Sequence, residues 1–167
     1  MPPALAAALL AAALAGCGAG RPPASAATPA RLAVARAQRS AEITLRIAGG
    51  GAAQGYTLNG SVKGGLLYSV PERWTVRVRL VNRGAGARFS CVLEPAPGTS
   101  ARVPAAIAQP RPRAGVAPGR SAIVSFGAPA APALYRLEAV AGAGQPTGLW
   151  VSVEVTRGGS PSVRRLR

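Results

Sequence analysis

Alternation of apolar and polar residues dominates the chain from Glu42 onward. In residues 73–82 the apolar side chains Trp74, Val76, Val78 and Leu80 occupy every second position. A period of two places successive side chains on opposite faces of a strand, so this segment predicts a half-buried antiparallel strand. Its solvated face would carry three arginines, which are Arg73, Arg77 and Arg79.

The same pattern, or a weaker one, marks the other strands that we expect. They lie at residues 42–47, 55–58, 66–70, 88–94, 121–126, 133–140 and 149–156. Glycine and proline turns separate them, for example at residues 70–73 and 117–120. About eight short strands divided by turn residues predict an all-β sandwich or barrel. The pattern indicates no long amphipathic helix.

One long segment, residues 95–120, does not fit this alternation. It contains six prolines and little periodicity. A loop of this length is unusual inside a compact domain. We expect this segment to be either a loop with a function or a mobile insertion.

The N-terminal residues resemble an export signal. Residues 4–15 are nearly all Ala and Leu, and this run is shorter than the ~20 residues that span a bilayer as a helix. It continues as Leu14-Ala15-Gly16-Cys17, which resembles the lipobox of bacterial lipoproteins, where the cysteine receives the lipid. The segment before the run carries no Lys or Arg, and a chance cysteine in an Ala-rich leader is the alternative.

These patterns divide the chain into four parts. Residues 1–16 form the expected lipoprotein signal peptide, and residues 17–40, rich in Ala, Pro and Arg, the expected disordered tether. Residues 41–157 form the β-domain, and residues 158–167 a basic tail. With a lipid on Cys17, the protein would be exported and anchored to the membrane or envelope on its extracytoplasmic side.

Composition excludes several kinds of chemistry. The 167 residues include 20 Lys and Arg, 5 Asp and Glu and no His, for a net charge of +15. All five acidic residues are glutamates, on different predicted strands or turns. Without His or Asp, no Ser-His-Asp triad, histidine metal site or aspartate pair can form. We therefore expect no catalytic residues and no enzyme, although a serine or tyrosine mechanism is an alternative.

The basic excess suggests an anionic partner. The export signal and the sparse aromatic residues, 4% of the chain, argue against nucleic acid. A positive face near a membrane would attract anionic lipid or a wall polymer. The alternative is a solvated face without a partner.

Four segments, in order, resemble the sulfocyanin family of blue-copper proteins. They are residues 59–76, with Asn59-Gly60 and VPERWTV; residues 81–84, VNRG; residues 114–122, AGVAPGRSA; and residues 135–151, with Tyr135 and TGLWV. The resemblance covers residues 42–156. It implies the cupredoxin fold, a Greek-key β-sandwich of about eight strands, which agrees with the strand count above.

The resemblance also implies a copper site, held by two His, one Cys and an axial Met. At the matching positions this chain has Phe89, Ala139, Gly144 and Leu149. A blue-copper site needs a thiolate and two imidazoles, and these residues offer none. We therefore expect a degenerate member with no metal ligands and no cofactor.

Cys91 is the remaining thiol of the predicted domain. It lies on the inward face of its predicted strand with Phe89 and Leu93, where a buried thiol is inert. A redox sensor, an intermolecular link or a disulfide with Cys17 are the alternatives.

The sequence thus favours a non-enzymatic, copper-free cupredoxin-like envelope lipoprotein. It would act as a structural module or bind a protein partner of the envelope. The alternative is a sulfocyanin-like copper protein that transfers electrons.

Overall fold

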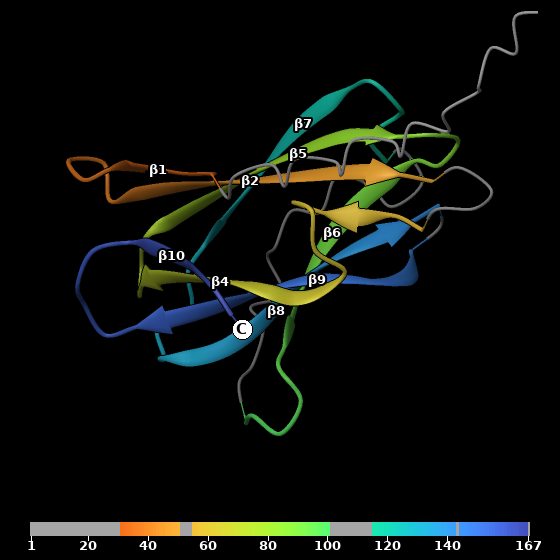
Figure 1. Cartoon of the computed structure of the whole chain (residues 1–167). Coiled ribbons are helices and arrows are strands. Elements are labelled where there is room, and N and C mark those ends of the chain that lie inside the picture. Colours follow the sequence, from red (N-terminus) through yellow and green to blue (C-terminus); the bar gives the residue numbers. More distant parts are fainter. Residues whose placement is uncertain (1–30, 51–54, 101–114, 143, 167) are drawn as a thin grey trace, which may run out of the picture.

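Two five-stranded β-sheets face each other in the computed structural model, which describes residues 31–50, 55–100, 115–142 and 144–166 (Figure 1). The strands are β1 (Arg31–Ala35), β2 (Ser40–Gly49), β3 (Thr57–Leu58), β4 (Lys63–Pro71), β5 (Thr75–Gly84), β6 (Phe89–Pro95), β7 (Ser121–Gly127), β8 (Ala133–Ala141), β9 (Gln145–Thr156) and β10 (Ser162–Arg165). The all-β prediction is confirmed. Within the described residues, no helix is long and apolar enough to span a membrane.

The chain crosses repeatedly between the two sheets. Sheet A has the order β1-β2-β5-β7, with β3 also paired to β2, and sheet B has the order β10-β4-β9-β8-β6. From β3 to β8, successive strands belong to alternate sheets. Both sheets are mixed, because β2 runs parallel to β5 and β4 runs parallel to β9.

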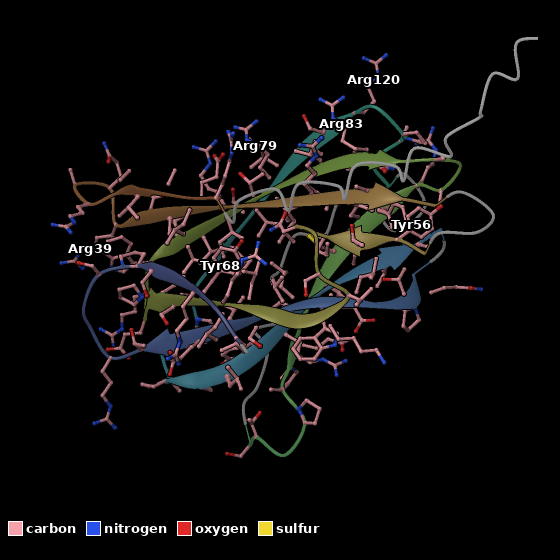
Figure 2. The ribbon with its side chains drawn as sticks, in the orientation of Figure 1. Arg39, Tyr56, Tyr68, Arg79, Arg83 and Arg120 are labelled. Carbon is pink, nitrogen blue, oxygen red and sulfur yellow. The ribbon has the colours of Figure 1, made fainter. Side chains whose placement is uncertain are left out.

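The core forms where the inward faces of the sheets meet. Alternate residues of β2 and β5, from Ala41 to Ile47 and from Val76 to Leu80, are fully buried. They pack in one apolar cluster with the inward side chains of sheet B, such as Tyr68, Leu137 and Val153. Figure 2 shows Tyr68 between the two sheets, whereas Arg79 and Arg83 point away from the sandwich. The period-two pattern therefore reports burial correctly.

Both ends of the described chain differ from the sequence prediction. Residues 31–40 were expected to belong to a disordered tether, but β1 forms an antiparallel ladder with β2. The period-two signal is weak there because β1 is an edge strand, and of its side chains only Leu32 is partly buried. In the basic tail, β10 forms the edge strand of sheet B and pairs with β4. Residues 1–30, which include the predicted signal and Cys17, lie outside the described residues.

The Pro-rich segment connects β6 of sheet B to β7 of sheet A. Strand β6 ends at Pro95 and β7 begins at Ser121. Residues 96–100 and 115–120 form no strand, although Val116 makes an isolated bridge to Phe89. Residues 101–114 lie outside the described residues, so the prediction for them stays a prediction.

A buried amide joins this segment to sheet A. The Asn82 Nδ2 donates hydrogen bonds to the Ala87 carbonyl at 2.8 Å and the Val116 carbonyl at 2.9 Å. Its Oδ1 accepts from the Gly84 N–H at 3.0 Å, and the side chain is fully buried. One side chain therefore satisfies three backbone groups at the end of β5.

Replacement of Asn82 by Ala should lower the free energy of unfolding by about 2–4 kcal/mol, because buried backbone groups lose their partners. Urea denaturation followed by circular dichroism measures this loss. Thr99→Ala is the control, since among the residues that the structure describes the Thr99 hydroxyl bonds the Ala96 carbonyl alone, in a partly buried turn. Equal effects of the two substitutions would contradict the role assigned to Asn82.

Candidate functional site

The four positions that the family resemblance matches to copper ligands lie at one end of the sandwich. Phe89 is on β6, Ala139 on β8 and Leu149 on β9. Ala139 lies directly across the ladder from Leu149 and, on its other side, from Cys91. Phe89 is two residues before Cys91, so it lies diagonally across from Ala139 on the same inward face.

Three of these four positions belong to the apolar core. Phe89 and Ala139 are fully buried, Leu149 is nearly so, and all three belong to the central cluster. Gly144 differs, because it is exposed in the turn between β8 and β9 and has a φ of 98°. The structure therefore brings Phe89, Ala139 and Leu149 together and leaves Gly144 outside the group.

Tyr56 covers Phe89 and was not singled out by the sequence analysis. The two rings meet edge to face, with centroids 4.9 Å apart and an interplanar angle of 77°. The Tyr56 hydroxyl donates a hydrogen bond of 2.6 Å to the Ala85 carbonyl. A Cβ on Gly84 would come within 2.8 Å of the Tyr56 ring. The glycines around Tyr56 were the available sequence signal, since a large side chain needs such space beside it.

Cys91 is a buried thiol beside this group. Burial raises the pKa of the thiol to about 12, because the thiolate would lose its hydration. A metal ligand must be a thiolate, so Cys91 is a poor ligand at neutral pH. Cys17 lies outside the described residues, and a disulfide between the two stays untested.

The residues at this end do not fit a copper ion. Phe, Ala and Leu side chains have no donor atom, and nowhere in the described part of the chain do three His, Cys, Asp or Glu residues gather as a metal site. Elsewhere in the core, the Tyr68 hydroxyl accepts a hydrogen bond of 3.2 Å from the Asn59 Nδ2. Burial also raises the pKa of Tyr68 to about 12, so its hydroxyl is neutral at physiological pH.

A polar cluster lies on the outer face of sheet B, close to Gly144. The Arg136 guanidinium stacks over the Trp150 ring, 5.2 Å from its centroid, and donates a bond of 3.1 Å to Glu138. The second Glu138 oxygen accepts from the Gly148 N–H. Each charge therefore has a partner. Trp150 packs against this outer cluster, on the face opposite to the buried Leu149 and Val151.

A basic hollow lies on the outer face of sheet A. Its volume is about 700 Å³, and its lining includes Arg31, Arg46, Arg79, Arg83 and Glu42. The sequence predicts a basic face with Arg73, Arg77 and Arg79. Arg77 and Arg79 do lie on β5, but Arg73 is in the turn before it, with a φ of 62°. Arg31, Arg46 and Arg83 were missed because they come from three different strands.

Comparison with known proteins identifies the fold. No protein-family model matches the chain, and no curated protein matches it. A laccase from Pediococcus acidilactici is 16% identical with a TM-score of 0.51, over 76% of this chain and 28% of the laccase. A multicopper oxidase from Campylobacter jejuni is 16% identical with a TM-score of 0.50, over 78% of this chain and 28% of the oxidase.

A smaller protein is also similar, and its length is closer to that of this chain. Auracyanin from Roseiflexus castenholzii is 19% identical over 69% of this chain and 96% of its own, with a TM-score of 0.43. The chain spans only about 28% of the length of the two oxidases. Identities this low show the fold and nothing of the activity. The chain has a cupredoxin-like β-sandwich fold.

Proposed function

We propose that this protein is a copper-free, non-enzymatic cupredoxin-like lipoprotein of the bacterial envelope, a degenerate relative of the sulfocyanins. It acts as a structural module or binds an envelope protein. The observation that carries the proposal is the packing of Phe89, Ala139 and Leu149 in the apolar core. In this proposal, core packing replaces the metal site.

Packing energetics support this reading. Phe89 is fully buried between Tyr56 and the rest of the core, and a buried aromatic ring contributes several kcal/mol to stability. A polar or charged group placed there would lose its hydration. The end of the sandwich is therefore stable without a metal, and a copper ion would have to displace well-packed side chains.

Copper should not bind the native domain as a blue site. We expect no intense visible band with one equivalent of Cu(II) and no rise in melting temperature, since a ligand specific to the native state must stabilise it. Absorbance and differential scanning calorimetry test this. Cys91→Ala removes the thiol and serves as the control. A blue band and a rise in melting temperature that both persist in Cys91→Ala would contradict the copper-free proposal and support the electron-transfer alternative.

Phe89→Ala should lower the free energy of unfolding by about 3–5 kcal/mol, because it removes a fully buried ring and leaves a cavity. Phe89→Leu should cost clearly less. Leu134→Ala is the control on an exposed apolar side chain, 39% accessible, and should have little effect. Urea denaturation of the three variants measures the difference. If Phe89→Ala behaves like Leu134→Ala, Phe89 does not fill this end of the core.

Cys17 should carry the lipid. Mass spectrometry of the mature protein from membranes should find an N-terminal, acylated Cys17. Cys17→Ser should leave the precursor unprocessed or release the protein from the membrane fraction, because its anchor is lost. Cys91→Ser is the matched control and should remain in the membrane. A mature N-terminus at any other residue contradicts the lipoprotein assignment.

A further inference from the structure

We propose that the basic hollow on the outer face of sheet A docks onto an anionic phospholipid surface. The inference deepens the proposed function and rests on it, because it uses the lipid anchor at Cys17 to explain which anionic surface lies nearby.

Strand register brings the arginines of the hollow to one face. In the parallel ladder of β2 and β5, Arg46 lies opposite Val81, and Arg83 lies opposite Ala48. In the antiparallel ladder of β1 and β2, Arg31 lies opposite Thr44. Residues of one register row share a face, and that face is the opposite of the buried one. Figure 2 shows Arg79 and Arg83 extending from this side of the sandwich.

The backbone around the hollow is fixed by Asn59, which also lines it. The Asn59 side chain accepts a hydrogen bond of 2.7 Å from the Arg46 N–H and donates one of 2.9 Å to the Thr44 carbonyl. It thereby occupies the edge of β2 between the places where β1 and β3 pair with that strand. Arg46 therefore projects from a held backbone and not from a loop.

Among the described residues, the arginines of this face outnumber the carboxylates that pair with them. Glu42 is the carboxylate of the hollow, and it is already shared by Arg79 at 2.7 Å and Arg77 at 3.7 Å. Within the described residues, Arg31, Arg46 and Arg83 have no ion pair with a carboxylate.

The remaining acidic side chains belong to other parts of the molecule. Glu94 and Glu138 pair with Arg136, Glu154 bonds Ser69, and Glu72 precedes β5. Residues 1–30, 51–54 and 101–114 contain no Asp or Glu in their sequence. The hollow thus keeps an excess positive charge that an external anion can satisfy.

Guanidinium groups suit phosphate in particular. The planar fork of Arg donates two parallel hydrogen bonds to phosphate oxygens and is weakly hydrated, so it is readily placed at an interface. Lipid headgroups present phosphates side by side, which matches arginines spread over three strands. Each basic residue near an anionic bilayer contributes roughly a five-fold gain in binding.

The N-terminal end of the described chain lies at the hollow, and this position favours a membrane as the source of phosphate. Arg31, which lines the hollow, is also the first residue of β1. The 13 residues between Cys17 and Arg31 in sequence let these two residues lie at most about 50 Å apart when the chain is fully extended. An anchor at Cys17 therefore holds the hollow close to the bilayer, where a weak contact gains from high effective concentration.

Vesicle sedimentation with the full chain carrying Cys17→Ser tests the docking without the anchor. Vesicles of phosphatidylglycerol mixed with phosphatidylcholine should bind the protein, pure phosphatidylcholine should not, and added salt should weaken binding. The triple variant Arg31→Ser, Arg46→Ser, Arg83→Ser should bind about 100-fold more weakly. The matched control, Arg157→Ser, Arg164→Ser, Arg165→Ser, removes the same charge from exposed positions outside the hollow and should lose much less.

Each outcome decides the proposal once circular dichroism has shown that both triple variants are folded. Selective loss in the hollow variant supports docking. Equal loss in both variants means general charge attraction and overturns it, as does the absence of binding to phosphatidylglycerol. Binding of soluble inorganic polyphosphate through the hollow, without vesicle binding, also overturns it. Because Cys17 is already replaced, failure here is distinct from failure of lipidation, which mass spectrometry of the native chain reports.

Discussion

The hydrogen bonds of Asn82 hold together the end of the sandwich on which the other features depend. The Val116 carbonyl accepts from Asn82 Nδ2 and also from the Phe89 N–H at 3.1 Å. The Asn82 backbone meets the same loop, since its N–H donates to the Arg120 carbonyl and its carbonyl accepts from the Gly119 N–H. One residue therefore joins β5, the segment before β7 and the start of β6. Phe89 keeps its place because its backbone belongs to this network.

This network also orders the end of the interior that the family resemblance would assign to a metal. A site that binds copper draws its order from donor atoms around the ion, whereas this end draws its order from backbone bonds around Asn82 and from ring packing between Tyr56 and Phe89. Apolar packing is worth most where no cavity remains. Phe89 and Tyr56 supply the largest side chains at a place where Ala139 and the neighbouring glycines leave room.

The sequence predicted the sandwich well because burial in a sheet imposes a period of two, which is visible in β2 and β5. It failed at β1 and β10, because edge strands such as Arg31–Ala35 are held mainly by backbone hydrogen bonds, which leave no side-chain pattern. Positions 89, 139 and 149 could be grouped through the family resemblance. Tyr56 and the arginines of the hollow could not be grouped in this way. The arginines lie together because of the strand register across β1, β2 and β5, which the sequence pattern does not reveal.

The two outer faces of the sandwich differ in charge, and this limits how the molecule can use its surface. Sheet A carries arginines with Glu42 as the carboxylate of its hollow. Sheet B carries Glu94, Glu138 and Glu154, each held by Arg136 or Ser69. Its strands also carry Lys63, Arg164 and Arg165, so it is less basic than sheet A and not acidic. A sandwich with one strongly basic face orients itself at an anionic boundary, because rotation would bring the acidic groups toward it. In the proposed function, core packing takes the place of a metal site, so a binding role depends on these outer faces. In the proposed docking, their unequal charge turns the face of sheet A to the membrane and leaves the face of sheet B open to a protein partner.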